Sequence, residues 1–359
     1  MASETSVLAV FIFTFLIGIP SNLLAFYTFL VKLRRKPTPI DVLLLNLTLS
    51  DILLLLFLPL KMVEVSSHMT WPLPPSLCPL TSCCFYGSMY LSILSLTSIS
   101  VDRYLGVAYP IKYKLHRRPV YALVTSIMLW LLGGFHCSII YIVRYGGSNE
   151  NLPFPPNSSR CYENFSPEQF RVIFSLRLEL CLVFFCLPFI ITLFCYVNII
   201  RILNSLSNVQ AGRKRRAMGL AVATLLNFTI CFAPYNISHI VGFIQNQSPP
   251  WRVEGFLLST LNTSMDPFIF FFSSKAIRQT LSDCWGSVCH KLQAVMPCFK
   301  HPTDDDGDEG ADAGRFSSSH LQSGLKGDDA QTEVFLDQPA KTHSVRAEGN
   351  PQQAPRTAH

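Results

Sequence analysis

Charged side chains are scarce in this chain. Asp, Glu, Lys and Arg make up 14% of its 359 residues, against about 25% in an ordinary soluble domain. Apolar residues reach 49% of the chain and gather in long runs. This composition excludes an ordinary soluble globular protein and favours one whose solvent is a lipid bilayer.

Seven apolar runs each extend for about 20 residues or more. A helix of that length, rising about 1.5 Å per residue, crosses a hydrocarbon layer roughly 30 Å thick. Seven crossings place the two termini on opposite sides of the membrane. The sequence therefore predicts an all-α membrane protein with a seven-transmembrane helix bundle. The runs lie near residues 6–31, 40–64, 79–101, 120–143, 171–201, 217–244 and 253–273.

Three further absences narrow the class of protein. The two halves of the chain show no self-similarity, whereas secondary transporters usually contain internal repeats with discontinuous helices. Neighbouring runs carry no pair of nucleophile and base of the kind that an intramembrane protease needs, so we expect no enzyme activity. No small-residue cleavage site follows the first run, and we therefore interpret it as a retained anchor rather than a signal peptide.

The few basic residues lie on one side of the predicted membrane. By the positive-inside rule the connections that carry them face the cytoplasm, which puts the N-terminus outside and the C-terminus inside. A charge run beside a membrane span usually sets topology, so the net charge of +6 does not indicate nucleic-acid binding. The residues are Lys32, Arg34, Arg35 and Lys36 after the first run, Lys112, Lys114, Arg117 and Arg118 after the third, and Arg213, Lys214, Arg215 and Arg216 before the sixth.

The chain changes character after the seventh run. Ile277, Leu281, Trp285 and Val288 recur every three or four residues, which predicts a short amphipathic eighth helix along the inner membrane surface. From about residue 300 large apolar side chains almost vanish, which predicts disorder. We therefore divide the chain into a seven-transmembrane domain with helix 8, residues 1–290, and a disordered cytoplasmic tail, residues 291–359. The candidate palmitoylation sites, with free thiols as the alternative, are Cys284, Cys289 and Cys298.

Two cysteines differ in position from the rest. Most of the twelve cysteines fall inside apolar runs, where Cys is a common small packing residue. Cys78 instead begins the third run, and Cys161 lies in the loop between the fourth and fifth. Both positions face the oxidising side of the membrane, so we predict a disulfide between them.

Polar residues near the middle of four runs suggest an ion site. Side chains of this kind are costly in a membrane and are functional candidates by default. Two carboxylates with amide and hydroxyl oxygens suit a small hard cation, and sodium would relieve the repulsion between two ionised acids. The alternative is a hydrated hydrogen-bond network without a fixed ion. The candidate sodium ligands are Asp51, Ser92, Asn262 and Asp266, with Asn22 at similar depth.

Proline interrupts the fifth, sixth and seventh runs. Pro188, Pro234 and Pro267 each remove a backbone hydrogen bond and clash with the preceding turn, so the helix kinks there. Phe232 lies two residues before Pro234, where its bulk can work as a lever during a swing of the sixth helix. The pattern predicts helices that move against each other.

Together these motifs resemble the class A (rhodopsin-like) G-protein-coupled receptors over about residues 6–290. The motifs are Asn22, Asp51 in Leu-Ser-Asp, Asp102-Arg103-Tyr104, Trp130, Pro188, Cys231-Phe232-Ala233-Pro234 and Asp266-Pro267-Phe268-Ile269-Phe270. The chain departs from the usual pattern at Phe232, where the family has Trp, and at Asp266 and Phe270, where it has Asn and Tyr. The resemblance implies activation and G-protein coupling roles for Asp102, Arg103, Tyr104, Phe232, Pro234, Asp266, Pro267 and Phe270.

Four other segments resemble the short-chain free fatty acid receptor family. They are Cys161-Tyr162-Glu163-Asn164-Phe165, Arg177-Leu178-Glu179-Leu180-Cys181, Pro234-Tyr235-Asn236-Ile237-Ser238-His239 and Pro250-Trp251-Arg252. In that family two arginines and a histidine at the outer ends of spans five, six and seven hold the ligand carboxylate. By matching motif these are Arg177, His239 and Arg252, with Tyr86 and Tyr90 lining the same pocket. Glu163 is expected to pair with one of the arginines.

The positions of these three residues support the same interpretation. Arg177 lies 11 residues before Pro188, His239 five after Pro234, and Arg252 15 before Pro267, so all three fall in the outer half of the bundle. Groups of this chemistry at one depth make an anion site, in which Arg offers a bidentate fork to a carboxylate. The alternative is that the arginines only extend to the membrane interface, as basic residues near helix ends often do.

We therefore expect a plasma-membrane receptor for extracellular short-chain carboxylates. The resemblance implies acetate, propionate and butyrate as ligands, coupling to heterotrimeric Gi/o and Gq/11 proteins, and recruitment of arrestins by the serine-containing tail. No cofactor is expected apart from the sodium ion. The alternatives are a related receptor for longer-chain or other carboxylates and, more remotely, a monocarboxylate transporter. Asn157 and Asn164 stand in outward sequons and are the candidate glycosylation sites.

Overall fold

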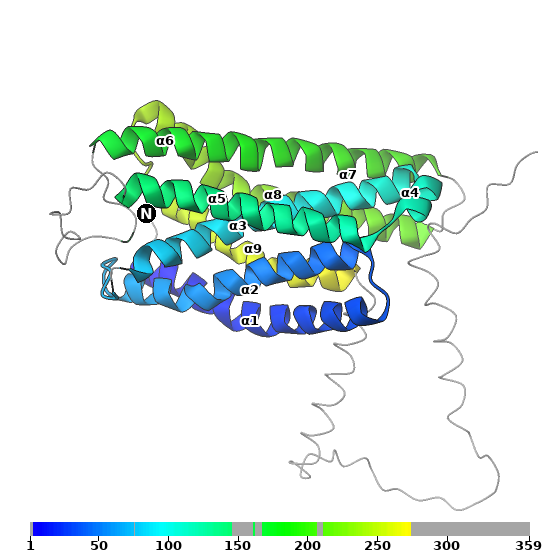
Figure 1. Cartoon of the computed structure of the whole chain (residues 1–359), viewed down its shortest axis with the longest axis horizontal. Helices are drawn as coiled ribbons and strands as arrows, with labels where there is room; N and C mark the ends of the chain where they lie inside the picture. Colours follow the sequence, from blue (N-terminus) through cyan, green and yellow to red (C-terminus); the bar gives the residue numbers. More distant parts are fainter. Residues whose placement is uncertain (1–2, 75, 146–160, 162–166, 207–210, 274–359) are drawn as a thin grey trace, which may run out of the picture. The chain divides into compact units, whose positions relative to one another are not determined.

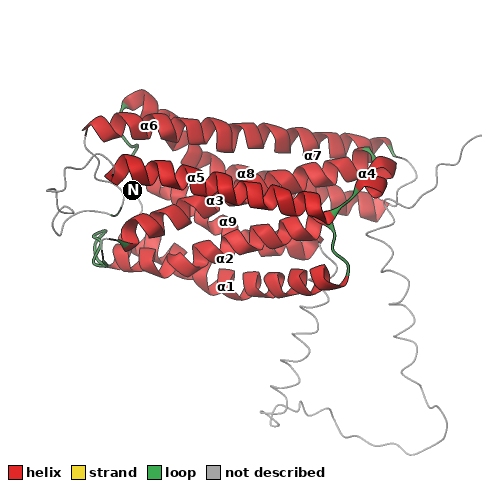
Figure 2. Cartoon of the chain, in the orientation of Figure 1, coloured by secondary structure: helices red, strands yellow, loops and turns green. Residues whose placement is uncertain are grey.

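The computed structural model describes residues 3–74, 76–145, 161, 167–206 and 211–273. Within these residues the chain is helical, with short turns between helices and no strand (Figures 1 and 2). The helices are α1 (Glu4–Arg35), α2 (Pro39–Ser66), α3 (Leu77–Ala108), the short α4 (Pro110–His116), α5 (Pro119–Tyr145), α6 (Pro167–Cys181), a π-helical turn (Leu182–Cys186), α7 (Leu187–Ser205), α8 (Ala211–Gln245) and α9 (Arg252–Ser273). The predicted eighth helix and tail lie outside the described residues.

Six of the described helical segments are long and apolar enough to cross a membrane. They are α1, α2, α3, Pro119–Ile139 of α5, the continuous segment Arg171–Ser205 and Lys214–Gln245 of α8. The seventh predicted run is the helix α9, which buries the polar residues Ser259, Asn262, Thr263 and Asp266 and is correspondingly less apolar. The predicted runs were too short at several ends, because the helices continue into polar residues; α3 extends to Ala108, beyond the expected residue 101.

The helices lie side by side as an antiparallel bundle (Figure 1). α1 packs on α2, α2 on α3 and α5, α3 on α7, and α9 on both α8 and α1. Large apolar side chains point outward from these helices, including Leu16, Leu56, Leu131 and Ile190, each more than 60% exposed. Such a surface would be unstable in water but matches the hydrocarbon of a bilayer.

Aromatic rings fill the middle of the bundle between α7 and α8. Phe228 packs edge-on against Phe232 at 5.5 Å between ring centroids, and it stacks on Phe185 at 6.0 Å. Phe228 and Phe232 are almost completely buried. Phe232 therefore lies in the core, two residues before Pro234, where the sequence analysis placed a lever.

At two of the three prolines, a side chain from another helix donates to a carbonyl group near the proline. At the third, Pro188, a π-helical turn ends two residues earlier. Pro267 lacks the N–H that would bond the carbonyl of Thr263, and Asn22 Nδ2 donates to that carbonyl at 2.9 Å. Beside Pro234, Ser259 Oγ donates to the carbonyl of Cys231 at 2.9 Å. These hydrogen bonds satisfy backbone carbonyl groups that water does not reach inside a membrane.

α8 and α9 approach each other closely at Gly255. A Cβ atom at Gly255 would lie 2.8 Å from the backbone nitrogen of Tyr235 and 3.0 Å from the carbonyl carbon of Pro234. Only glycine fits this position without moving one helix away from the other. The contact holds the beginning of α9 against the kink in α8.

Candidate ligand site at the disulfide end of the bundle

Cys78 and Cys161 form a disulfide at one end of the bundle. We call this end the disulfide end, and the end that carries Asp102, Arg103 and Tyr104 the triplet end. The bond ties residue 161 to the first turn of α3, as the sequence analysis predicted.

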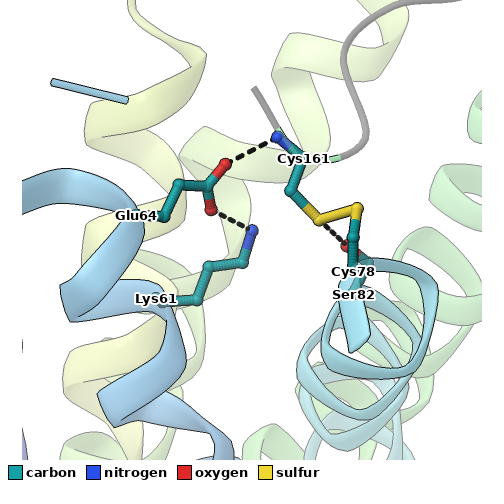
Figure 3. A network of polar contacts seen from close by, with 5 residues as sticks. All are labelled: Lys61, Glu64, Cys78, Ser82 and Cys161. Carbon is teal, nitrogen blue, oxygen red and sulfur yellow. Dashed lines mark hydrogen bonds and ion pairs between the residues drawn. A yellow bond between two sulfur atoms is a disulfide. The ribbon is translucent and has the colours of Figure 1, made fainter. Parts of the chain in front are cut away.

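A buried ion pair supports the disulfide from α2 (Figure 3). Glu64 Oε1 accepts a hydrogen bond from the backbone nitrogen of Cys161 at 2.7 Å, and Glu64 Oε2 pairs with Lys61 Nζ at 2.9 Å. Both side chains are at most 10% exposed. Sequence analysis missed this pair, although the spacing of three residues between a lysine and a glutamate in an apolar run is a readable signal. Residue 161 is thus held by α2 as well as by α3.

The two candidate arginines converge on one oxygen atom. Arg177 Nη1 of α6 donates to Ser248 Oγ at 3.3 Å, and Arg252 Nη1 at the beginning of α9 donates to the same oxygen at 3.5 Å. Arg252 Nη2 also donates to the hydroxyl of Tyr235 at 3.2 Å. Ser248 was not among the predicted residues, because nothing in a loop serine signals that Arg177, 71 residues away, meets Arg252 there.

His239, the third candidate residue, lies in α8 and is 3% exposed. Its Nε2 lies 3.3 Å from the hydroxyl of Tyr90, which also donates to Asn236 Oδ1 at 3.5 Å. His239 Nδ1 is buried and has no hydrogen-bond partner among the described residues. The structure therefore brings together His239 and Tyr90, two of the residues that the sequence analysis assigned to the pocket.

Aromatic rings enclose the polar groups. Tyr86 stacks on Tyr235 with 6.1 Å between ring centroids, and the guanidinium of Arg252 lies 5.5 Å from the Tyr235 centroid. Phe256 contacts both rings at 5.3 and 5.6 Å. Rings in these positions exclude water and favour a cation over their faces, which fixes the orientation of Arg252.

A cavity of about 50 Å³ opens among these side chains. Its polar lining comes from both arginines, His239, His136 and three tyrosines. The rest is apolar or small, and comes from α3, α5, α6 and the π-helical turn. The complete lining is Tyr86, Gly87, Tyr90, Gly133, His136, Cys137, Ile173, Leu176, Arg177, Leu180, Phe184, Tyr235, His239 and Arg252.

His136 of α5 is another lining residue that the sequence analysis missed. Its ring packs edge-on against Phe184 at 4.5 Å, and its Nε2 lies 3.7 Å from Glu179 Oε1 of α6. A single histidine in an apolar run is usually a packing residue, so the sequence alone gave no reason to select it. The contacts place it between α5 and α6 beside the cavity.

The polar residues predicted to bind sodium also cluster. Ser92 Oγ donates to Asp51 Oδ1 at 3.3 Å, and Asn262 Nδ2 donates to Asp266 Oδ2 at 2.8 Å. The two carboxylates are close enough to interact electrostatically. Asp51 Oδ2 is buried without a hydrogen-bond partner among the described residues. Two members were not predicted, namely Ser50, 3.1 Å from Ser92, and Asn227, which donates to Asn262 Oδ1 at 2.6 Å.

At the triplet end the charged residues bind tyrosines from other helices. The hydroxyl of Tyr113 in α4 donates to Asp102 Oδ1 at 2.7 Å, and Arg103 Nη1 donates to the hydroxyl of Tyr196 in α7 at 3.3 Å. Tyr104 packs edge-on against Phe194 of α7. Burial and then the neighbouring Asp102 carboxylate raise the pKa of Tyr113, so this hydroxyl remains a donor throughout the physiological range.

Several predicted sites lie outside the described residues. They are Glu163, the sequon residues Asn157 and Asn164, the cysteines Cys284, Cys289 and Cys298, and the side chain of Phe270. Their roles remain predictions.

Comparison with known proteins agrees with this arrangement. The family described as 7 transmembrane receptor (rhodopsin family) matches residues 21–270. The chain is 49% identical to Free fatty acid receptor 2 of Mus musculus over 274 residues, which cover 76% of this chain and 83% of that protein. It is 47% identical to Free fatty acid receptor 2 of Homo sapiens over 274 residues, 76% of this chain and 83% of that one. It is 44% identical to Free fatty acid receptor 3 of Homo sapiens over 283 residues, 79% of this chain and 81% of that one.

Proposed function

The chain belongs to the rhodopsin family of seven-transmembrane receptors and, within it, to the free fatty acid receptors, and from this premise we propose that it is a receptor for extracellular short-chain fatty acids. It is a multi-pass membrane receptor and not an enzyme, and family membership implies a ligand and G-protein partners. The proposed ligands are acetate, propionate and butyrate.

The convergence of Arg177 and Arg252 on a single oxygen is the observation that carries the proposal. Each guanidinium is directed at Ser248 Oγ from a different helix. A carboxylate oxygen at this point would receive charge-assisted hydrogen bonds from both, and such bonds are about twice as strong as neutral ones. His239 and Tyr90 line the same cavity, where a ring N–H of His239 or the hydroxyl of Tyr90 can donate to the second carboxylate oxygen. These groups fit a monocarboxylate head.

The size of the cavity favours short acids over the longer-chain alternative. A cavity volume of about 10–15 Å³ holds one water molecule. Counting one heavy atom for each water, the cavity of about 50 Å³ has room for roughly three to five heavy atoms without rearrangement. Acetate, propionate and butyrate fall in or near that range, whereas a long acyl chain does not. Binding is expected to be weak, because at about 1.5 kcal/mol per heavy atom acetate cannot exceed about 6 kcal/mol.

For orientation, we propose that the disulfide end faces outside the cell and the triplet end faces the cytoplasm. Disulfides persist in oxidising compartments, and the basic connections lie at the triplet end. The G proteins proposed to bind there are Gi/o and Gq/11, with arrestins recruited by the tail. Sodium is proposed as an allosteric ion at Asp51, Ser92, Asn262 and Asp266, where the partnerless Asp51 Oδ2 fits a ligand to a hard cation.

A calcium and cyclic-AMP dose response to straight-chain acids of one to ten carbons tests the function. We expect responses to two- to four-carbon acids at about 0.1 mM or above, falling off with longer chains. Flux of labelled acetate into vesicles that contain the protein should equal the flux into empty vesicles. A response only to long-chain acids, nanomolar binding of acetate, or clear acetate flux would each overturn the proposal.

A further inference from the structure

Two cysteines lie at the two ends of the π-helical turn that joins α6 to α7. Cys181 is the last residue of α6, and Cys186 is the last residue of the turn. Both are free thiols, and their sulfur atoms are 4.0 Å apart. Cys181 is completely buried, and Cys186 is half-buried. The sequence analysis counted both as packing cysteines, and residues five apart do not face each other in an α-helix.

The π-helical turn brings the two cysteines together. In an α-helix, residues five apart have Cα atoms about 8.6 Å apart, given the rise, turn and radius of that helix. A disulfide requires Cα atoms about 4.4–6.8 Å apart, so an α-helix excludes it. In a π-helix, hydrogen bonds join residues five apart, as the backbone nitrogen of Leu187 does here with the carbonyl of Leu182. Such residues then lie one above the other, like residues four apart in an α-helix, where the Cα distance is about 6.2 Å.

The turn connects the ligand cavity with the aromatic core. Phe184 lines the cavity and packs against Tyr90 at 5.9 Å between ring centroids. Its neighbour Phe185 stacks on Phe228 at 6.0 Å, and Phe228 packs against Phe232. A change from π-helix to α-helix would rotate the residues before the turn by about 100° relative to those after it. Phe184 and Phe185 could not then both keep their present neighbours.

We propose that Cys181 and Cys186 are a modification site, at which oxidation by hydrogen peroxide forms a disulfide that fixes the π-helical turn. The sulfur of Cys186, the more exposed thiol, attacks one peroxide oxygen. The O–O bond breaks, which leaves a sulfenic acid on Cys186 and releases the other oxygen as water. The sulfur of Cys181 then attacks the sulfur of Cys186, the S–O bond breaks, and the hydroxyl leaves as a second water with the thiol proton of Cys181. The two sulfurs lose two electrons, which reduce the peroxide to two waters.

The disulfide keeps the segment π-helical, because the α-helical form holds the two cysteines too far apart. A fixed turn cannot rearrange between the cavity and the core, so binding at Arg177 has less effect on the rest of the bundle. The oxidised receptor therefore responds to propionate more weakly. Buried thiols react slowly, so the site responds to sustained exposure to peroxide. The effect on signalling rests on the proposed function, whereas formation of the bond does not.

The first measurement detects the bond itself. Full-length receptor in membranes is treated with hydrogen peroxide and then denatured, its remaining thiols are labelled with a maleimide, and its peptides are weighed without reduction. We expect the segment from Cys181 to Cys186 to be lighter than the dithiol by two hydrogen atoms and to carry no label. Cys195, a buried free thiol of α7, should take the label. Two labelled thiols, or a sulfinic acid on Cys186 beside a free Cys181, would overturn the proposal.

The second measurement compares propionate dose responses before and after peroxide at matched surface expression. After peroxide, the wild-type response should move at least about fivefold to higher concentration, the lower end of typical coupling between sites. Cys186→Ser and Cys186→Ala should match wild type before peroxide, because Cys186 does not line the cavity, and should not change after it. The control variant Cys195→Ser should keep the wild-type shift.

The outcomes separate this inference from the function on which its signalling effect rests. A receptor that responds to no acid overturns the proposed function, while the peptide masses still decide whether the disulfide forms. An equal peroxide shift in wild type and in both Cys186 variants would show that oxidation acts elsewhere, and would overturn the role of the π-helical turn in signalling.

Discussion

The charged residues are arranged differently at the two ends of the bundle. At the disulfide end two arginines from α6 and α9 are directed at one serine oxygen. At the triplet end Asp102 and Arg103, neighbours in sequence, bind tyrosines on two different helices, α4 and α7. Charge of one sign gathered at a point suits the capture of a small anion. Charge distributed between helices suits a surface whose helices must move relative to one another.

The first test breaks the support beneath the disulfide end. Glu64→Ala removes the acceptor for the Cys161 backbone nitrogen and leaves Lys61 buried without its partner. Breaking a buried pair in this way typically costs about 3–5 kcal/mol, so we expect a clear fall in the apparent melting temperature of the detergent-solubilised receptor.

A double variant provides the control for this test. Lys61→Met with Glu64→Gln removes both charges while keeping similar volumes, and should recover much of the lost stability. A melting temperature that is unchanged by Glu64→Ala, or that falls further in the double variant, would show that the pair does not support the fold.

The second test removes the convergence of charge. Arg177→Ala and Arg252→Ala should each reduce the propionate response by about 10- to 150-fold, because one charge-assisted hydrogen bond contributes about 1.5–3 kcal/mol. Arg171→Ala, at an exposed position on the same helix as Arg177, serves as the control and should respond as wild type does. Wild-type sensitivity in both arginine variants, measured by calcium release at equal surface expression, would disprove the anion site.

The third test concerns the triplet end. A carboxylate near the beginning of α8 could pair with Arg103 and hold α3 and α8 together in the inactive state. Residues 213–218 contain no carboxylate, so we expect basal G-protein signalling without ligand. Lys214→Glu should lower that signal about tenfold, the effect of about 1.4 kcal/mol, and should move the propionate response to higher concentration, because one equilibrium governs both.

The control for this test is Lys214→Gln, which removes the positive charge without adding a carboxylate and should change the basal signal much less. Basal cyclic-AMP and calcium signals equal to those of mock-transfected cells would contradict the expected basal signalling.

The fourth test has the smallest expected effect and refines the picture of the arginine pair. Ser248→Ala removes the oxygen shared by Arg177 and Arg252. Both hydrogen bonds to it are long, at 3.3 and 3.5 Å, so we expect a contribution of only about 0.5–1.5 kcal/mol. We expect a shift of about two- to tenfold in propionate potency, equal for all acids, with recovery in Ser248→Thr. A shift that depends on chain length would place Ser248 near the tail of the ligand rather than near its carboxylate.

The sequence predicted the bundle because its signals are local. Apolar runs of spanning length fix the number and order of helices, and motifs such as Cys231-Phe232-Ala233-Pro234 identify the family, a prediction that the comparisons confirm. The helix ends were predicted less accurately. The predicted runs were shorter than the helices, since α1 and α3 each extend to 32 residues. Polar residues at the membrane interface can continue a helix without making the run apolar.

Residues whose role arises from packing were missed. Ser248, His136, Glu64 and Asn227 each contact groups from another part of the chain. The sequence does not show which residues far apart in the chain come into contact. A serine, histidine or asparagine in or beside an apolar run also has no distinctive pattern.

The sequence by itself determined the class of molecule. Its apolar runs are long enough to span a bilayer and contain few charged residues, and such runs are stable as membrane-spanning helices. It also indicated which basic residues lie in the same half of the bundle, since their spacing from the prolines is fixed by helical rise. Only the tertiary structure decided that two arginines meet at one oxygen and that Gly87 and Gly133 line the cavity. Those facts depend on how the helices pack against each other, and the close approach of α3 and α5 is set by side-chain volumes from residues far apart in the chain.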